Sequence, residues 1–456
     1  MINAPLTPSF ASTGIAYLCQ MSDIKKTQKK ILEKLKIEQL NPMQEEAKLA
    51  IHSHSEVVLL SPTGTGKTLA FLLPIIAMLD AQNLNTQVLI LVPSRELAIQ
   101  IESVIREMGS GFKTNAVYGG RSGSKDKIDL KHRPTILIGT PGRLADHFRR
   151  ETLSLSDINY LVLDEFDKSL EVGFENEMKE IIQALPNVKK KILTSATQKI
   201  KIPEFVGLQN PLTINYQQEE ASQLKIKIVH SPSKDKLDTL VDTLCHIGNK
   251  PGIIFCNFKE SINRVSEFLS ANKINHGSFH GNMEQIDRER SLIKFRNGTY
   301  QLIIATDLAA RGLDIPELNF IIHYQLPAKE HEFVHRNGRT ARMNKGGTAY
   351  IIKWEEEKSP DFIKDAEVEE LLEAPIPLPS KWKTIYITGG RRDKISKGDI
   401  AGFFFKQGQL NKDDVGMIDV KQDFSFVAVK ASKANRIVKA LNNTRLKKKK
   451  VRISLI

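Results

Sequence analysis

Short apolar runs and longer helix-patterned stretches alternate through residues 24–350. The apolar runs of the first part lie at residues 57–60, 88–92, 135–138, 160–163 and 191–193. A second series follows after residue 223, at residues 252–255, 301–304, 320–323 and 348–352. Apolar strands separated by helices are typical of parallel sheets that are covered on both faces. The pattern therefore predicts an α/β protein with two such sheets in tandem.

Polar and proline-rich stretches divide the chain further. The polar residues 216–222 are predicted to be a hinge between a first domain at residues 21–215 and a second at residues 223–360. Residues 361–382 contain three prolines and are expected to form a stiff linker. Residues 1–20 lack the basic start and clean apolar core of a signal peptide, and we expect them to be a disordered extension.

Residues 383–456 have the pattern of a small α+β domain. Strands are predicted at residues 384–387, 417–420, 424–429 and 451–455, with helices at 399–406 and 433–442 between them. The segment contains 18 Lys and Arg against 6 Asp and Glu, so it carries +12 of the formal net charge of +13. An excess this local favours binding to a polyanion over a merely solvated basic face.

Cysteine usage and hydropathy indicate a cytoplasmic protein. Cys19, Cys245 and Cys256 are widely spaced and form no zinc or disulfide pattern, which fits a reducing compartment. The longest apolar run, at residues 69–79, is shorter than the ~20 residues of a membrane span and contains Pro74. We therefore expect no membrane association. We also expect a monomer.

A phosphate-binding loop is predicted where the first strand meets the next helix. Residues 61–68 read Ser-Pro-Thr-Gly-Thr-Gly-Lys-Thr, with Ser61 at a position where the general pattern has glycine. Gly64 and Gly66 would let backbone N–H groups close around phosphate oxygens at the start of the helix. Lys67 would reach the terminal phosphates, and Thr68 would bind Mg²⁺.

An acidic stretch follows the strand at residues 160–163 and supplies the second half of a nucleotide site. Asp164 could hold Mg²⁺ through water, and Glu165 could orient the attacking water as the base. An acidic strand end by itself is often just solvated. Together with the phosphate loop, it predicts ATP hydrolysis.

Further motifs in a fixed order make residues 35–350 resemble the DEAD-box RNA helicases. In the first domain the motifs are residues 41–44 (Asn-Pro-Met-Gln), 93–98 (Pro-Ser-Arg-Glu-Leu-Ala), 119–120 (Gly-Gly), 140–143 (Thr-Pro-Gly-Arg) and 195–197 (Ser-Ala-Thr). In the second domain they are residues 254–257 (Ile-Phe-Cys-Asn), 285–288 (Gln-x-x-Arg), 305–307 (Ala-Thr-Asp), 311–314 (Arg-Gly-Leu-Asp) and 335–342. The resemblance implies two RecA-like domains that close on ATP, Mg²⁺ and single-stranded RNA.

The resemblance also implies roles for individual residues. ATP would be bound by Gln44, Ser61, Thr63, Gly64, Thr65, Gly66, Lys67, Thr68 and Asp314. RNA would be bound by Pro93, Arg95, Gly119, Gly120, Thr140, Pro141, Gly142, Arg143, Gln285, Arg288, Thr306, Arg311 and Gly312. Hydrolysis would be coupled to strand separation by Ser195, Thr197, Asp167 and His335.

Two arginines are predicted to complete the ATP site from the second domain. Arg339 and Arg342 are three positions apart, so on a helix they would share one face. There they could stabilise the charge of the transferred phosphate only when the domains close. Structural salt bridges are the alternative for both arginines. For His335, the alternative to a relay between RNA and nucleotide contacts is a buried, hydrogen-bonded histidine.

Three residues depart from the family pattern. Phe166 stands where the family has alanine, so the acidic loop must make room for a ring. Ile37 lies where an adenine-stacking aromatic residue usually precedes the glutamine, and Asn337 replaces an apolar residue between the arginines. The metal and base carboxylates next to Phe166 are retained.

The C-terminal segment is similar to the RNA-binding domain of the DbpA group. The similarity is carried by residues 385–392, 394–400, 416–419 and 426–429, and implies an RRM-like fold. In that group the domain grips a hairpin of 23S ribosomal RNA, which implies action on pre-50S particles. Phe424 and Phe426 could stack on bases or could belong to the core. Residues 447–450, all lysine, are expected to form a phosphate-contacting loop.

Two other functions are compatible with parts of this pattern. An RNA-annealing or ribosome-scaffolding protein could use ATP only to set its affinity, although the complete hydrolysis motifs disfavour it. A DNA helicase or general P-loop ATPase is disfavoured by the RNA-type motifs and by the separate basic domain.

Overall fold

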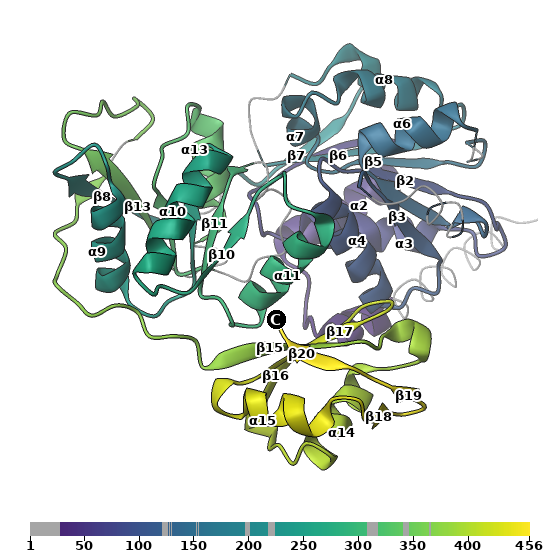
Figure 1. Cartoon of the computed structure of the whole chain (residues 1–456). Helices are drawn as coiled ribbons and strands as arrows, with labels where there is room; N and C mark the ends of the chain where they lie inside the picture. The colour runs from purple at the N-terminus through teal and green to yellow at the C-terminus, as the bar shows by residue number, and fades with distance from the viewer. Residues whose placement is uncertain are drawn as a thin grey trace, which may run out of the picture. The chain divides into compact units, whose positions relative to one another are not determined.

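The computed structural model describes residues 28–120, 126, 128, 130–151, 153, 155–196, 201–217, 224–307, 318–340, 346–363 and 366–456. These residues form two compact units, one ending before residue 222 and one beginning there. The first unit holds one parallel sheet (Figure 1). The second unit holds another parallel sheet and a small antiparallel sheet.

The sheet of the first unit has seven parallel strands in the order β3-β4-β2-β5-β6-β1-β7. The strands are β1 (Glu56–Leu60), β2 (Val88–Leu91), β3 (Thr114–Val117), β4 (Ile136–Gly139), β5 (Tyr160–Leu163), β6 (Lys190–Ser195) and β7 (Leu212–Asn215). The helices are α2 (Pro42–Ser53), α3 (Lys67–Met78), α4 (Arg95–Met108), α6 (Pro141–Arg149), α7 (Phe166–Glu171) and α8 (Glu175–Gln183).

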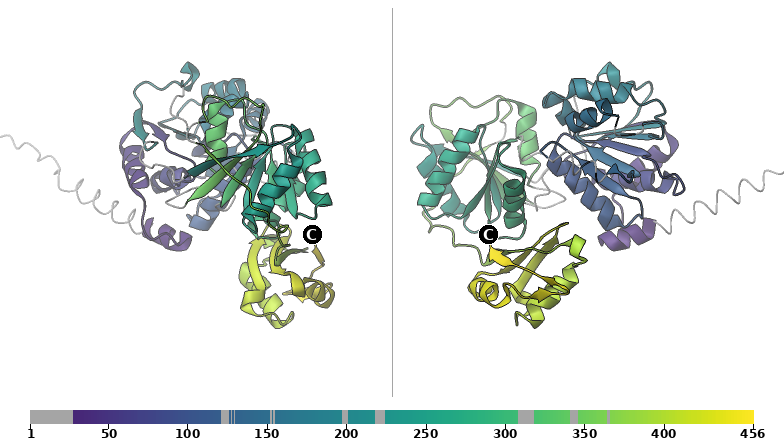
Figure 2. Two further views of the ribbon diagram at one scale, coloured as in Figure 1. Left: turned by 90° about the vertical axis from the view of Figure 1, so that its left-hand side faces the viewer. Right: turned by 45° about the vertical axis from the view of Figure 1, so that its right-hand side comes forward.

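Neighbouring residues of each central strand enter opposite cores. Val57 and Leu59 pack in one cluster with residues of α2, α3 and α4, while Val58 packs in another with residues of α6 and α8. Successive side chains of a strand point to opposite faces, so a continuous apolar run fills both cores. The strands accordingly lie between layers of helices (Figure 2).

The second parallel sheet is built in the same way, in the order β10-β11-β9-β12-β13-β8-β14. Its strands are β8 (Leu224–Ser231), β9 (Gly252–Phe255), β10 (His276–Phe279), β11 (Leu302–Ala305), β12 (Phe320–His323), β13 (Gly347–Trp354) and β14 (Glu367–Val368). Its helices are α9 (Leu237–Ile247), α10 (Lys259–Ala271), α11 (Gln285–Arg296) and α13 (Glu330–Asn337). Ile253 and Ile254 again enter different clusters.

The antiparallel sheet has the order β16-β17-β15-β20. Its strands are β15 (Trp382–Ile387), β16 (Val415–Val420), β17 (Ser425–Lys430) and β20 (Ile453–Leu455). Helices α14 (Lys397–Lys406) and α15 (Ala431–Leu441) supply Phe404 and Ile437 to a core with Ile385 and Val427. A short hairpin, β18 (Arg445–Leu446) and β19 (Lys449–Lys450), precedes the last strand.

The predicted fold class, two tandem RecA-like domains and a small α+β domain, is confirmed. The predicted strands all exist, with ends shifted by a few residues, but in the two parallel sheets the hydrophobic pattern did not predict β3, β7, β8, β10 and β14. Four of these are the edge strands of the two parallel sheets, and β8 lies next to an edge. Edge strands bury fewer side chains, so their sequences are more polar. One of them, β14, lies within the predicted linker and pairs with β8.

Within the described ranges, none of the helices has the length and apolar content that a membrane crossing requires.

His323, at the end of β12, is a fully buried titratable group. Its ring stacks on Phe333 with 4.7 Å between ring centroids, and its Nε2 lies 3.0 Å from Asn337 Oδ1. Burial and the nearby Arg336 guanidinium lower the pKa of His323 to about 3. The native ring is therefore neutral at pH values where a histidine of the unfolded chain is charged.

We expect the second domain to lose stability as pH falls below about 6.5, because the unfolded chain then binds a proton that native His323 excludes. At pH 5 this difference destabilises the folded state by about 2 kcal/mol relative to pH 8. Urea unfolding of the full chain at both pH values measures it. His323→Phe should reduce the pH dependence, whereas His230→Asn, at an exposed histidine, should not. An unchanged pH dependence in His323→Phe would contradict the assignment.

Candidate nucleotide and RNA sites

The phosphate loop connects β1 to α3 and depends on two glycines. Gly64 and Gly66 have φ angles of 89° and 86°, a region that other residues rarely adopt. The side chain of Lys67 folds back so that its Nζ donates to the carbonyl oxygens of Ser61 (2.6 Å) and Pro62 (2.8 Å). The ammonium therefore lies inside the loop, where it could exchange carbonyl partners for phosphate oxygens.

The polar residues of the N-terminal motif hold this loop from the side of α2. Gln44 Nε2 donates to the carbonyl of Gly66 (3.2 Å), and Asn41 Nδ2 donates to that of Thr65 (2.9 Å). Asn41 and Gln44 also cap each other's backbone N–H at the start of α2. A Cβ atom at Gly66 would lie 2.3 Å from Gln44 Nε2, so this glycine is also required by the close approach. The predicted adenine-binding glutamine therefore contacts the phosphate loop.

Ser61 is fully buried and belongs to the same network. Its hydroxyl donates to Thr65 Oγ1 (2.7 Å), and the Thr65 hydroxyl donates to the carbonyl of Pro62 (2.9 Å). Thr63 and Thr68 are partly exposed at the mouth of the loop. The serine at this position thus cross-links the two sides of the loop.

The acidic residues lie at the end of β5, two strands away from the phosphate loop. Asp164 is buried and accepts a hydrogen bond from Thr194 Oγ1, which itself accepts from the backbone N–H of Glu165 (3.1 Å). Glu165 has a φ of 48°, a strained conformation for a residue with a side chain. Thr194 and Ser195 belong to β6, which lies between β5 and β1. The loops that follow these three strands therefore lie together at the carboxyl ends of the strands.

Burial controls the protonation of these carboxylates. It raises the pKa of Asp164 to about 6, with a further contribution from the adjacent Glu165. The pKa of Asp167 is also raised by burial, although Lys168 opposes the shift. Buried carboxylates favour their neutral form unless a cation is near, and the Lys67 charge opposes this effect only in part at Asp164. Phe166, between Glu165 and Asp167, packs its ring among buried residues of the core that includes α6 and α8.

The predicted RNA-binding loops of the first domain follow β2, β3 and β4, which are neighbours in the sheet. Arg95 begins α4 and packs against the two glycines that follow β3: a Cβ atom at Gly120 would lie 2.6 Å from Arg95 Nη1. Pro93 precedes this helix. Thr140 is the N-cap of α6, without a side-chain cap hydrogen bond, and Pro141 and Gly142 form the first turn. The structure therefore brings these loops together at the carboxyl ends of β2, β3 and β4.

In the second domain, Gln285 and Arg288 lie in the first turn of α11. Arg288 is buried, with its guanidinium 4.9 Å from the centroid of the Phe279 ring. Thr306 follows β11, and His335 lies partly exposed near the end of α13. The remaining predicted residues Thr197, Arg311, Gly312, Asp314 and Arg342 lie outside the described residues.

The prediction that a helix carries Arg339 was wrong. Helix α13 ends at Asn337, and Arg339 lies in a turn after the cap residue Gly338. Thr340 then donates its hydroxyl to the carbonyl of Leu318 (2.5 Å) and forms an isolated bridge with that residue. Gly338 caps the helix, and the chain then forms the bridge to Leu318. Arg339 is buried.

Sequence reasoning missed Arg336, which joins three motifs of the second domain. Its Nε donates to Asp307 Oδ1 (2.7 Å), its Nη1 to the carbonyl of Gln325 (2.6 Å) and its Nη2 to Asn257 Oδ1 (2.7 Å). Nη2 also donates to Asp307 Oδ2, and the guanidinium lies 5.0 Å from the Phe255 ring centroid. The signal in the sequence was that Arg336 lies in the arginine-rich motif at residues 335–342. Asp307, in another motif, was its possible partner.

Three family models match the chain in succession. They are the DEAD/DEAH box helicase model at residues 41–205, the helicase conserved C-terminal domain at residues 235–344 and the DbpA RNA-binding domain at residues 384–455. The ATP-dependent RNA helicase DbpA of Bacillus subtilis is 32% identical over an alignment of 437 residues that covers 88% of this chain and 91% of the relative. The DbpA of Escherichia coli is 32% identical over 91% of this chain and 94% of its own.

The chain belongs to the DEAD-box ATP-dependent RNA helicases of the DbpA group.

Solved structures of this helicase family agree with the assignment. Dbp5 of S. cerevisiae bound to RNA and ADP BeF3 matches with a TM-score of 0.64 and 26% identity, covering 72% of this chain and 88% of that one. Mss116p bound to single-stranded RNA and AMP-PNP matches with a TM-score of 0.66 and 25% identity, covering 75% and 76%.

The RNA-binding domain of this helicase presents lysines on the β18–β19 hairpin. Lys447 Nζ lies 2.7 Å from the carbonyl of Lys394 and from Asp399 Oδ2. Lys449 pairs with Asp393 at 2.7 Å, while Lys448 is exposed. Of the two candidate stacking residues, Phe426 is buried against Tyr386, and Phe424 is partly exposed.

We expect Arg336→Gln to destabilise the second domain by about 3–5 kcal/mol, because it leaves the Asp307 carboxylate without the buried cation that it pairs with. Arg336→Lys should recover only part of this, because lysine cannot bond three groups in one plane. Urea unfolding of the full chain measures both. Arg264→Ala, which breaks an exposed pair with Asp235, is the matched control and should change stability by less than about 1 kcal/mol. A similarly small effect of Arg336→Gln would contradict the role of Arg336.

Proposed function

We propose that this helicase hydrolyses ATP with Mg²⁺ to unwind short RNA duplexes locally, and that its target is a hairpin of 23S ribosomal RNA in pre-50S particles. The observation that carries the proposal is the convergence of Lys67, Asp164 and Glu165 at one sheet edge, in a chain that ends in a strongly basic DbpA-type domain. The protein would act in the cytoplasm as a monomer.

The chemistry follows from the residues at this edge. The buried Asp164 carboxylate and the Thr68 hydroxyl suit a hydrated divalent cation, because a cation would keep the carboxylate ionised despite its burial. Bound Mg²⁺ would neutralise charge on the phosphates. Glu165 would accept a proton from the attacking water, and Lys67 would move from the Ser61 and Pro62 carbonyls to phosphate oxygens. Arg339 and Arg342 would add positive charge when the domains close.

RNA would be held by small residues and arginines that approach its phosphates. Arg95, Gly119, Gly120 and the first turn of α6 would bind one strand in the first domain, with Ser195, Thr197, Asp167 and His335 coupling that grip to hydrolysis. The second domain would contribute Gln285, Arg288, Thr306, Arg311 and Gly312. Bending of one strand between these contacts would separate a short duplex.

Target choice is assigned to residues 383–456. Their charge of +12 supports a large electrostatic contribution to RNA affinity, since binding releases counterions from the phosphates. An ATP-regulated annealing or scaffolding protein is the alternative. It would bind the same RNA but would show no RNA-stimulated turnover.

Glu165→Gln tests the proposed reaction. The variant should still bind ATP, because the metal and phosphate ligands remain, but RNA-stimulated hydrolysis should fall by about 100-fold or more. Glu175→Gln, at an exposed carboxylate of α8, is the control and should hydrolyse ATP at the normal rate. Absence of RNA-stimulated hydrolysis in the unmodified protein would favour the annealing alternative. Near-normal hydrolysis in Glu165→Gln would remove Glu165 from its assigned role.

Removal of residues 383–456 tests target choice. Because the remaining chain is nearly neutral, we expect weaker binding to hairpin RNA and a shallower dependence of affinity on salt. Hydrolysis should persist at high RNA concentration, but a 23S hairpin should no longer stimulate better than an unrelated RNA of equal length. ATPase rates against concentration of both RNAs, at two salt concentrations, give the answer. A truncated protein that still prefers the 23S hairpin would place specificity in the helicase domains.

A further inference from the structure

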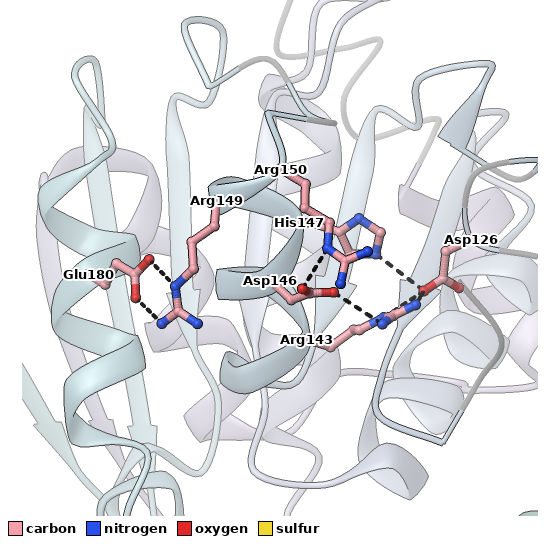
Figure 3. Close-up of polar contacts among 7 residues, drawn as sticks. All are labelled: Asp126, Arg143, Asp146, His147, Arg149, Arg150 and Glu180. Carbon is pink, nitrogen blue, oxygen red and sulfur yellow. Dashed lines mark hydrogen bonds and ion pairs between the residues drawn. The ribbon is translucent and has the colours of Figure 1, made fainter. Parts of the chain in front are cut away.

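Arg143 directs its guanidinium into the protein in the first domain (Figure 3). Its Nε and Nη2 lie 2.8 and 2.6 Å from Asp126 Oδ2, and its Nη1 lies 3.2 Å from Asp146 Oδ2. The Asp126 side chain is fully buried, and the Arg143 side chain is only 17% exposed. His147, one turn after Arg143 on α6, places its Nε2 3.2 Å from the same Asp126 oxygen.

Two predicted RNA-binding loops are joined by this cluster. Asp126 follows the Gly119-Gly120 pair in the chain, and Arg143 follows Thr140 and Gly142 at the start of α6. The ion pair therefore ties the segment after one loop to the first turn of the helix that forms the other. Gly120 also lies close to Arg95, at the start of α4.

We propose that Arg143 and Asp126 are positioning residues for RNA binding, and that Arg143 does not itself neutralise an RNA phosphate. The proposal rests on RNA binding by these loops, as proposed above. It differs in that Arg143 holds the loops and makes no direct contact with RNA. Three of its nitrogen atoms donate to carboxylates, two of them to an oxygen that solvent does not reach. Moving the guanidinium to a phosphate would leave the Asp126 carboxylate buried without that cation, which is strongly unfavourable.

The two possible roles of Arg143 predict opposite effects of Asp126→Asn. If Arg143 binds phosphate, the substitution removes a competing negative charge and should leave RNA affinity unchanged or raise it. If Arg143 is a positioning residue, the substitution releases the loops and should weaken RNA binding, against the direction of simple electrostatics. We expect a loss of at least about fivefold in affinity for a single-stranded RNA.

The experiment measures RNA affinity of the full chain at several salt concentrations for the unmodified protein, Asp126→Asn, Arg143→Ala and the double variant. The positioning role predicts similar losses in all three variants, because each breaks the same pair, and an unchanged slope of log affinity against log salt. Direct contact predicts a slope that falls by about 0.7 in Arg143→Ala, the value for one phosphate of a single strand. That result, or full affinity in Asp126→Asn, would overturn the proposal.

Arg149 and Glu180 provide the matched control on the same helix. They form an ion pair with Arg149 Nε 2.8 Å from Glu180 Oε1, but the Arg149 side chain is 61% exposed (Figure 3). Glu180→Gln should leave RNA affinity unchanged. A loss in Glu180→Gln equal to that in Asp126→Asn would show a general effect of charge on α6 and would also overturn the proposal.

Two further measurements distinguish a loss of folding from a loss of RNA binding. ATP affinity without RNA reports whether Asp126→Asn leaves the first domain folded. If it does not, Arg143→Lys serves in its place: lysine keeps a charge for a phosphate but cannot place two donors on Asp126, so positioning predicts a loss of affinity and direct contact predicts none. An unmodified protein that bound no RNA would refute the proposed function itself, whereas retained binding in Asp126→Asn would refute only the positioning role.

Discussion

Burial of both faces of each parallel sheet is the constraint on which the rest of the molecule depends. Val57, Val58 and Leu59 fill two cores from one strand, and Ile253 and Ile254 do the same in the second sheet. Such strands leave no face for polar side chains. Polar chemistry is therefore confined to the loops at the strand ends, and parallel pairing brings the carboxyl ends of all strands to one edge. The phosphate loop, Asp164 and the glycine pair all lie in these loops.

Flexible loops alone would not fix the positions of the polar side chains at the strand ends. Buried polar contacts hold these loops in place. Arg336 in the second domain and Arg143 in the first each meet a carboxylate that comes from a distant part of the sequence. Lys67 meets backbone carbonyls in the same manner. A buried cation is tolerated only with such partners, so each one fixes the segments that carry them. Charge inside this helicase thus holds together segments that are separate in the sequence.

The limits of sequence reasoning follow from the same physics. Central strands such as β5 and β12 were predicted to the residue, because burial on both faces makes their runs apolar. The edge strand β3, with the sequence Thr-Asn-Ala-Val, carries no such signal. The nucleotide site was predicted from its motifs, and the structure places Lys67 and Asp164 after strands β1 and β5. Asp126 could not be found, because nothing in the chain near it indicates a partner that lies 17 positions later. Arg339 was misplaced because spacing alone does not show that Gly338 ends the helix.

The departures from the family pattern have local partners that explain why the fold tolerates them. Phe166, the first residue of α7, places its ring in a core of the first unit, so the acidic loop accommodates it without exposing it. Asn337 accepts a hydrogen bond from the buried His323, whose other ring nitrogen has no hydrogen-bond partner in the part of the chain that the structure describes. The single bond assigns the proton to Nε2, since a neutral ring has one donor nitrogen. An apolar residue at 337 would leave that donor buried and unsatisfied, which is unfavourable. Asn337 and His323 therefore form one feature, in which the Asn337 amide oxygen accepts the Nε2 proton of His323 and holds the last residue of α13 against the end of β12, two positions before Arg339.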